Sequence, residues 1–350
     1  MRKYYADIIQ FRGDHQAFGY EQGKWLLSSP LFKIYQQQNT QTKRPRFVVN
    51  TEEATAWLTE LFPALLEELK GISIAIGFTL EQTIAFFSGY QQEWKRSGCS
   101  ILTGDNFLIR NYDFHPKTYE GRFVMYQPLA SKGYATIGAS QRIVGRADGM
   151  NEEGLTVGYN FVNRRNGGNG FIPTIITRML LEQCATNEEA IALIKKVPHR
   201  HSFNYVLADK FGNSHVVEAT ANAIRVKESK ISTNHFDLLP EANRYHLADS
   251  KRRYAILEKQ LTSSLTIEQA FQLFNNVEEE IYSKKYLQSA GTLHTSLYDQ
   301  KKLAVYLALG NNRKPTPFSF QNWLDGEDTS IKKVLGVIDT DEKMPYIDGI

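Results

Sequence analysis

The chain has 350 residues, 42% of them hydrophobic, and its 41 basic residues nearly balance 38 acidic ones for a net charge of +3. This balance, without long runs of like charge, argues against nucleic acid or an anionic membrane as a partner. Two cysteines are too few for a disulfide framework. Because we find neither a signal-peptide pattern nor a stretch of roughly eighteen apolar residues, we expect a cytoplasmic protein.

Residues 1–98 are predicted to be mostly helical. A short strand at 8–13 comes first, and a helix at 17–27 follows it. Two glycines four residues apart lie on one face of that helix, which favours close packing against another helix. Cap signals begin two further helices, at Asn50 with Glu53 and at Thr79 with Gln82.

From residue 99 onward the pattern changes to blocks of strands interrupted by helices. Strands are expected at 100–102, 108–114, 122–126, 135–138, 142–145, 155–161, 203–208, 214–219, 224–226, 292–299 and 303–309. A turn is expected at 149–154, and helices are expected near 173–181, 186–194, 250–260 and 266–275. Such a sequence of elements is typical of stacked sheets covered by helices.

The first two of these strands form a predicted hairpin directly after Cys99. Its tight turn pairs the strands and brings Arg110 back towards the cysteine, where the guanidinium could lower a thiol pKa that is ordinarily about 8.5. Gly98 leaves the carbonyl before Cys99 unshielded. Asp113 falls on the opposite strand face in a regular ladder, and converges only if the strand ends near Asn111.

These residues alone leave two interpretations of the hairpin open. Cys99 is either a nucleophile or a small buried apolar residue, and Arg110 with Asp113 is either part of a site or a surface ion pair. Cys184 follows an apolar helix face and is expected in the core. No histidine has zinc-site spacing and no glycine-rich phosphate loop occurs, so we expect neither a metal nor a cofactor.

The motif Gly98-Cys99-Ser100, with residues 110–114 after it, resembles the N-terminal nucleophile (Ntn) hydrolases of the acyl-coenzyme A:isopenicillin N acyltransferase group (peptidase C45). That group is related to the choloylglycine hydrolases. Further motifs stand in the family's order, one before Cys99 at 19–23 and the others after it at 149–155, 204–209, 233–234 and 250–254. The resemblance therefore covers nearly the whole chain. The short hairpin and Phe114, where tryptophan is common in relatives, depart from the family pattern.

The resemblance implies a fold and a division of the chain. The fold would be an α+β, four-layer αββα sandwich. Residues 1–98 would form a mostly helical prosegment, and self-cleavage of the bond between Gly98 and Cys99 would separate it from a catalytic domain at 99–350.

The resemblance also implies roles for single residues. Cys99 would be the nucleophile, and Arg110 and Asp113 would hold its thiol and the new amine. Asn160 and Asn234 would bind the oxyanion and orient the nucleophile, although without the family both read as turn or strand-end residues.

Arg253 would be the last arginine of the site, with Ser250 a weaker candidate beside it. Read without the family, Arg253 and its neighbour Arg252 are simply solvated residues near a helix start.

The expected function is a self-processing cysteine hydrolase or acyltransferase that acts on a linear non-peptide amide through a thioester on Cys99. Its partners would be a small amide or acyl thioester and its own prosegment, and a homo-oligomer is left open. One alternative is a thiol hydrolase without self-cleavage that pairs Cys99 with His235 or His201. Another is a catalytically inactive binding protein on the same fold.

Overall fold

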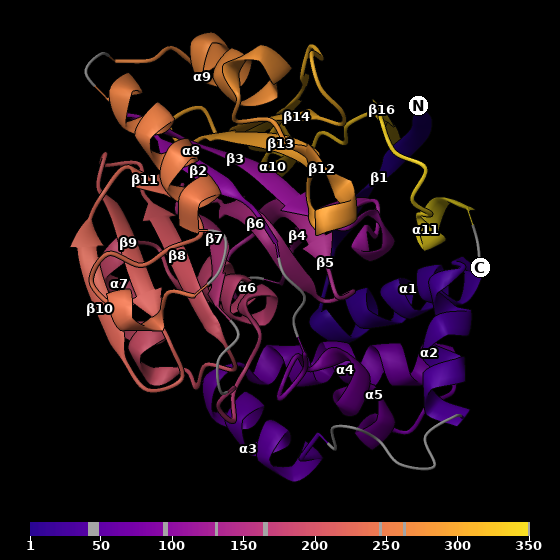
Figure 1. The fold of residues 1–350 in the computed structure, drawn as a ribbon. Helices are drawn as coiled ribbons and strands as arrows, with labels where there is room; N and C mark the ends of the chain where they lie inside the picture. Colours follow the sequence, from indigo (N-terminus) through magenta and orange to yellow (C-terminus); the bar gives the residue numbers. More distant parts are fainter. Residues whose placement is uncertain are drawn as a thin grey trace.

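The computed structural model describes residues 1–40, 49–93, 97–129, 132–163, 167–244, 247–261 and 264–348. Two β-sheets stack face to face at its centre, with helices on their outer faces (Figure 1). The active-site candidates come from both sheets and from one of the outer helices, so this arrangement decides which of them meet.

The larger sheet has nine strands, and all neighbours in it are antiparallel except β1 and β4. Its order is β10 (Ile224–Glu228), β9 (Ser214–Ala219), β8 (Ser202–Ala208), β7 (Thr156–Asn163), β6 (Gly145–Asn151), β5 (Thr136–Gln141), β4 (Arg122–Gln127), β1 (Arg2–Arg12) and β16 (Lys333–Ile338).

The smaller sheet has seven strands and carries the hairpin that follows Cys99. Its order is β11 (Ile231–Ser232), β2 (Ser100–Thr103), β3 (Phe107–Phe114), β13 (Ala290–Asp299), β14 (Ala304–Ala308) and β15 (Thr316–Ser319), with β12 (Lys284–Lys285) paired to β13.

Helices cover the outer face of each sheet. On the nine-stranded sheet, α6 (Pro173–Gln183) lies over β5 to β7, and α7 (Asn187–Lys196) lies over β8 and β9. On the seven-stranded sheet, α8 (Leu247–Gln260) and α9 (Ile267–Asn275) cover β11, β2, β3 and β13. The predicted αββα layering is therefore confirmed.

The N-terminal part of the chain is built into this sandwich. Strand β1 pairs with β4 on one side and β16 on the other. Phe18 of the first helix stacks on Tyr126 of β4, at 4.1 Å between ring centroids, so this helix extends the outer layer next to α6. The helices that follow β1 are α1 (His15–Ser28), α2 (Leu31–Thr40), α3 (Thr51–Leu61), α4 (Pro63–Ile76) and α5 (Leu80–Phe87).

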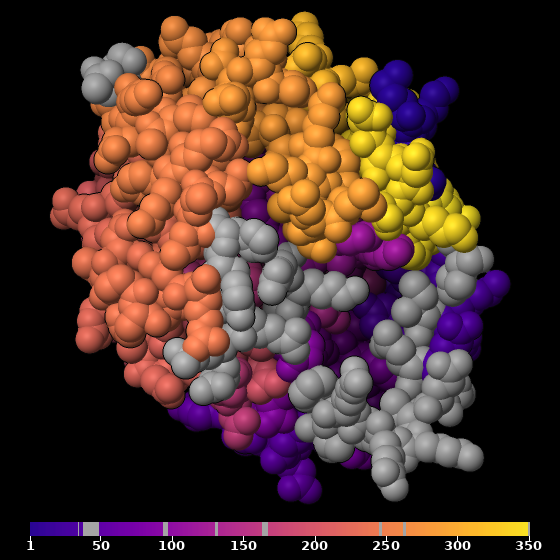
Figure 2. Space-filling view, viewed as in Figure 1, coloured from indigo at the N-terminus to yellow at the C-terminus, as the bar shows by residue number. Residues whose placement is uncertain are grey.

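Short helices complete the described part of the chain. They are α10 (Phe320–Leu324), α11 (Pro345–Asp348) and the 3₁₀ turns η1 (Pro116–Thr118), η2 (Pro240–Ala242), η3 (Val277–Glu279) and η4 (Tyr286–Gln288). The N-terminal strand lies beside the C-terminal part of the described chain, because β1 pairs with β16 (Figure 2). None of the helices in the described residues is long and apolar enough to span a bilayer.

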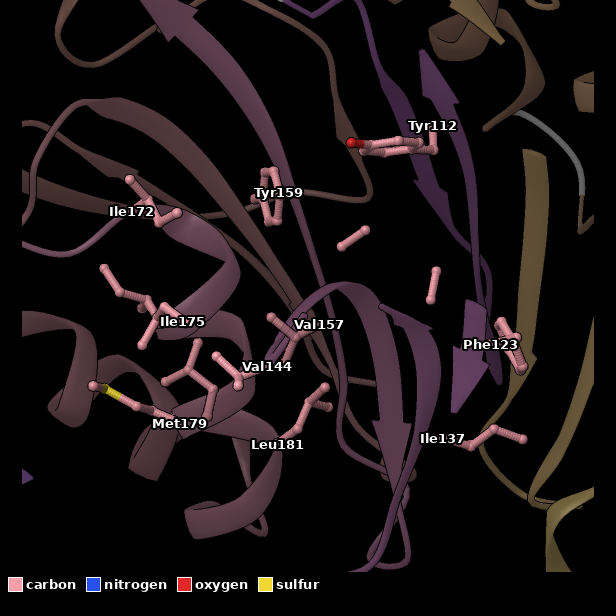
Figure 3. Packing of buried hydrophobic residues seen from close by; sticks show 14 of the residues in the cluster. Tyr112, Phe123, Ile137, Val144, Val157, Tyr159, Ile172, Ile175, Met179 and Leu181 are labelled. Carbon is pink, nitrogen blue, oxygen red and sulfur yellow. The ribbon is translucent and has the colours of Figure 1, made fainter. Parts of the chain in front are cut away.

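The hydrophobic core is divided by the sheets. Figure 3 shows Ile175, Met179 and Leu181 of α6 beside Val144 and Val157, in the layer between that helix and the nine-stranded sheet. Tyr112 and Phe123 lie in the layer between the two sheets (Figure 3). A separate cluster that includes Ile109 and Phe271 fills the space under α8 and α9.

The N-terminal helices pack closely on one another, and two buried contacts join them to α6. Gly19 of α1 lies so close to α4 that a Cβ atom there would be 1.9 Å from the Glu68 carbonyl oxygen, which confirms close helix packing as the reason for this glycine. Glu68 in turn binds Arg178 of α6 at 2.8 Å, and His15 binds Glu182 of α6 at 2.9 Å. All four side chains are buried, so the N-terminal helices are fixed by charge as well as by shape.

Most of the predicted elements are confirmed, including the caps at Asn50 and Thr79. The predicted strand at 142–145 is wrong. Arg142 and Ile143 have φ angles of 60° and 65°, and form the turn between β5 and β6. The predicted turn at 149–154 begins too early, because β6 continues to Asn151 and pairs there with β5.

Candidate active site

Cys99 lies immediately before β2, at the end of the predicted hairpin. The hairpin is present as expected, with Ser100 paired to Asn111 and Ile101 paired to Arg110. The cysteine is fully buried among residues of the layer between the two sheets. Side chains of both sheets can therefore reach its sulfur.

Two donors point at this sulfur. Nη2 of Arg110 lies 3.4 Å from Sγ, and the backbone N–H of Asp113 donates to Sγ, also at 3.4 Å. The Cys99 thiol is also placed to donate to the Asp113 carbonyl oxygen, which lies 3.7 Å from Sγ. Loss of that proton would leave a thiolate that keeps both donors. Burial raises the pKa of the Cys99 thiol in the intact chain, and the positive charge of Arg110 opposes this rise.

Arg110 is held in place by the nine-stranded sheet. Its guanidinium donates to the carbonyl oxygens of Ala147 and Tyr159, and forms a fully buried ion pair of 2.8 Å with Asp148. Asp148 was not among the sequence-predicted residues. It lies in β6, outside every motif used there, and only the stacking of the two sheets brings it to Arg110.

Asp148 is surrounded by further donors. Ser296 donates to it at 3.1 Å, the Tyr298 hydroxyl also donates to it, and Nε2 of His294 lies 3.5 Å away. Burial alone would raise the pKa of this carboxyl, but His294 and the charge of Arg110 hold it well below its usual range. Asp148 is therefore ionised at neutral pH and balances the charge of Arg110.

Asp113 contacts Cys99 through its backbone, whereas its carboxylate faces away. Strand β3 does not end at Asn111 but continues to Phe114, so Arg110 and Asp113 stay on opposite faces. A bulge in β13 places Thr292 opposite Asp113, and the Thr292 hydroxyl donates to Oδ1 at 2.7 Å. Oδ2 is buried without a hydrogen-bond partner among the described residues.

Burial raises the pKa of Asp113 well above its usual range, although Arg253, Thr292 and Arg110 act in the opposite direction. A buried carboxyl group with one unpaired oxygen is costly to keep charged. Among the described residues, no side chain donates a hydrogen bond to Oδ2 of Asp113, so this oxygen is free to accept one.

Arg253 and Asn234 bind the backbone on either side of the Gly98–Cys99 bond. Nη1 of Arg253 donates to the Cys99 carbonyl oxygen at 2.8 Å, and its Nη2 donates to Oδ1 of Asn234 at 2.8 Å. Nδ2 of Asn234 lies 3.3 Å from the Ser97 carbonyl oxygen. These two sequence-predicted residues thus meet at the cysteine.

Ser250 holds the segment that carries Asn234. The hydroxyl of Ser250 accepts a hydrogen bond from the Asn234 backbone N–H at 2.8 Å, and it contacts Nδ1 of His235 at 2.8 Å. Its role in the structure is thus to position Asn234, one helical turn from Arg253 on α8.

Asn160 lies one step away from Cys99, because it binds the strand that precedes Asn234. Its Nδ2 donates to the Ser232 hydroxyl at 3.0 Å, and its Oδ1 has no partner among the described residues. Its strand partner Asn204 donates to the carbonyl oxygens of Thr233 and His235. Both asparagines therefore bind the strand end that leads to Asn234.

Gly98 has a packing reason as well as a possible chemical one. A Cβ atom at this position would lie 2.8 Å from Cβ of Ala290, closer than side chains normally approach. Its backbone N–H donates to the Asp113 carbonyl oxygen at 3.1 Å, which fixes the peptide before Cys99 against β3.

His235, one of the histidines considered as a partner of Cys99, is held by other groups. Nδ1 of His235 contacts Ser250 and Thr233, and its Nε2 lies 3.4 Å from Asp237, so its ring is engaged on both sides. His201 is buried just before β8. Cys184 is buried in the core as expected, where burial raises its pKa to about 12. No cluster of metal-ligating side chains occurs within the described ranges.

We predict that Asp113→Asn makes the uncut chain more stable at high pH. In the unfolded chain Asp113 loses its proton near its reference pKa of about 3.9, whereas the folded state retains the proton to higher pH. The folded state thus binds more protons in this window, so the wild-type free energy of unfolding falls as pH rises through it. At pH 8 the variant should be more stable by roughly 1–3 kcal/mol, a difference that vanishes near pH 3.

The measurement is urea denaturation across pH, in a Cys99→Ala background that prevents cleavage. Asp105→Asn is the matched control, since the hydrogen bond and charge of Lys230 lower the pKa of this exposed carboxyl, which gives the opposite sign. Equal pH dependence of the Asp113 variant and its parent would refute the prediction.

We predict that Asp148→Asn lowers the pKa of the Cys99 thiol. The substitution removes the charge that balances Arg110, so the guanidinium favours the thiolate more strongly. It should also cost about 3–5 kcal/mol of stability, because Arg110 remains buried without its partner.

Cys99 alkylation against pH, followed by mass spectrometry of the Cys99 peptide, measures this shift. Ser296→Ala removes a donor to Asp148 but leaves its charge, and should not lower the thiol pKa. A thiol profile that is unchanged in Asp148→Asn would contradict the role given to this carboxylate.

A family model described as acyl-coenzyme A:6-aminopenicillanic acid acyl-transferase matches residues 101–314, more than half of the chain. The matched span contains Arg110, Asp113 and Arg253, and begins two residues after Cys99. No curated protein matches the sequence.

Solved structures that resemble the chain share little sequence with it. Penicillin V acylase from Agrobacterium tumefaciens has 15% identity and a TM-score of 0.43, over 63% of this chain and 84% of that one. A mutant conjugated bile acid hydrolase from Clostridium perfringens has 14% identity and a TM-score of 0.46, over 70% of this chain and 100% of that one. The Caenorhabditis elegans ortholog of N-acylethanolamine-hydrolyzing acid amidase has 13% identity and a TM-score of 0.39, over 58% of this chain and 92% of that one. By the family match, the chain belongs to the acyl-coenzyme A:6-aminopenicillanic acid acyl-transferase family.

Proposed function

We propose that the chain cleaves itself before Cys99 and then hydrolyses, or transfers the acyl group of, a linear non-peptide amide through a thioester on Cys99. The observation that carries this proposal is the pair of donors, from Arg110 and the Asp113 backbone, that converge on a buried cysteine sulfur. A cysteine that serves only to fill space needs no such donors.

In the self-cleavage step, Sγ of Cys99 attacks the carbonyl carbon of Gly98. A C–S bond forms, the peptide C–N bond breaks, and the nitrogen takes a proton to become the α-amine of Cys99. Water then opens the thioester, which gives the Gly98 carboxylate and the free thiol. The contact between Asn234 and the Ser97 carbonyl oxygen supports Asn234 as a donor near the oxyanion of this step.

The cut supplies the base that the intact site lacks. An α-amine has a reference pKa of about 7.7–8.0, so near neutral pH it can take the proton of its own thiol. When protonated it is a cation, and the unpaired carboxylate oxygen of Asp113 is a suitable counter-charge for it. We therefore propose that Asp113, whose carboxylate lies on the opposite strand face from the thiol, holds the new amine.

Turnover would use the same groups. The Cys99 thiolate, with Arg110 and the Asp113 N–H as donors, attacks the substrate carbonyl carbon and forms a thioester as the amine leaves with a proton. Arg253 holds the Cys99 carbonyl and orients Asn234. Water as the acceptor makes the chain an amidase, and an amine or thiol makes it an acyltransferase.

We predict that purified wild-type protein consists of two fragments, 1–98 and 99–350, that remain associated. Cys99→Ala should remain one chain without activity, because it removes the nucleophile of both steps. Cys184→Ala is the matched control, since it removes the other thiol and should be cut like the wild type. Intact mass spectrometry and hydrolysis of simple N-acyl amides measure these outcomes.

Two other outcomes would each support one of the two alternative functions. An uncut wild-type chain with Cys99-dependent activity would refute self-processing and support a thiol hydrolase that needs no cleavage. An uncut chain that binds amides without turnover would support the inactive binding protein.

We predict that Asn234→Asp slows both self-cleavage and kcat by roughly 10²–10³-fold, the effect of losing one oxyanion donor. The substitution keeps the oxygen that accepts from Arg253 but removes the amide N–H groups. Asn222→Asp, on an exposed turn, is the control and should change neither rate. A change in KM alone would show that Asn234 contributes to binding and not to the oxyanion.

A further inference from the structure

A large groove lies on the outer face of the seven-stranded sheet, where its helical cover ends. The groove has a volume of about 690 Å³. One wall is α9, with Ile267 and Phe271, and the floor is formed by Tyr306 of β14 and Pro317 of β15. Figure 1 shows α9 next to β14. This apolar surface is separate from the proposed reaction site, because the Cys99 side chain packs in the layer between the sheets.

The other wall of the groove is the loop between β14 and β15. Asn275 fixes this loop: its Nδ2 donates to the Gly310 carbonyl oxygen at 2.8 Å, and its Oδ1 accepts from the Arg313 backbone N–H at 2.7 Å. A second hollow of about 360 Å³, lined by Val334 and Leu335, lies on the other side of the loop. The loop is thus a fixed ridge between two hollows.

Charges of opposite sign line the two walls of the groove. Arg313 and Lys314 on the loop are exposed, and no ion pair is formed by either within the described parts of the chain. Glu268 in α9 and Glu278 in η3, which follows it, are also exposed and form no ion pair over the same ranges. The chain therefore presents an acidic wall and a basic ridge that do not neutralise each other.

We propose that this face is the interface of a homodimer. Around a two-fold axis a patch meets its own copy, so the basic ridge of each chain would lie against the acidic wall of the other. Both pairs of charges would then be satisfied at once, and the apolar floor would be removed from water. A small ligand of one charge would leave one of the two walls unpaired.

The contact would be made by side chains and not by pairing of sheet edges. Strand β15 is the edge of its sheet, and Pro317 within it has no N–H to donate to another strand. The fixed ridge favours association, because little conformational entropy is lost when it enters the groove of the second copy.

The test is the molar mass of the full chain by light scattering over a range of concentrations. The wild type should have twice the mass of one chain. Two charge reversals, Arg313→Glu with Lys314→Glu, or Glu268→Lys with Glu278→Lys, should each weaken association at least about tenfold, because like charges then face one another. Mixing the two variants should restore a dimer, since each supplies the charges that the other needs.

Lys301→Glu with Lys302→Glu is the matched control, as this exposed pair lies at the other end of β14 and should leave the dimer intact. Circular dichroism and cooperative urea denaturation check that each variant folds. A monomeric wild type, or reversed variants that remain dimers, would overturn the proposal. Neither outcome depends on whether the chain cleaves amides.

Discussion

The guanidinium of Arg110 is the contact on which both the packing of the sheets and the environment of Cys99 depend. It extends from the smaller sheet, binds two carbonyl oxygens and Asp148 of the larger one, and reaches the cysteine sulfur with a remaining N–H. A buried charge of this kind is tolerated only with a partner and nearly complete hydrogen bonding. The Arg110 N–H group that donates to the Cys99 sulfur is therefore held in position by the same bonds that hold the sheets together.

The remaining groups of the site are arranged around the backbone near Cys99 rather than around its thiol. Arg253 reaches this backbone from α8, and Asn234 reaches it from the segment after β11. Asn160, Asn204 and Ser250 act one step further away, because they bind that segment. Three layers of the sandwich thus converge on one peptide bond, which explains why the candidates are scattered over the whole sequence.

Local features of the sequence predict the structure well. The hairpin after Cys99 and the caps at Asn50 and Thr79 depend on residues within a few positions of one another, and each is present. The turn at Arg142 and Ile143 was missed, because an apolar run usually indicates a strand. In the structure both backbone N–H groups donate to the carboxylate of Glu120, a contact that the local sequence does not indicate.

Long-range contacts could not be predicted from the sequence. Nothing near Asp148 indicates that it faces Arg110, since the two meet only through the stacking of the sheets. The placement of the Asp113 carboxylate depends on a bulge in β13, about 180 positions later in the chain. The family resemblance supplied the roles that we propose for Asn234 and Arg253, which the residues alone left as ordinary polar positions.

The location of β1 has a consequence for how a processed chain could be assembled. This strand lies between β4 and β16, so residues 1–98 supply an interior part of the larger sheet. Two separate fragments would have to find each other in solution to rebuild it, and their refolding would become a concentration-dependent, bimolecular reaction. An unbroken chain folds without that encounter. Processing after folding would therefore convert a chain that can refold by itself into a molecule whose native state is maintained largely by its slow unfolding.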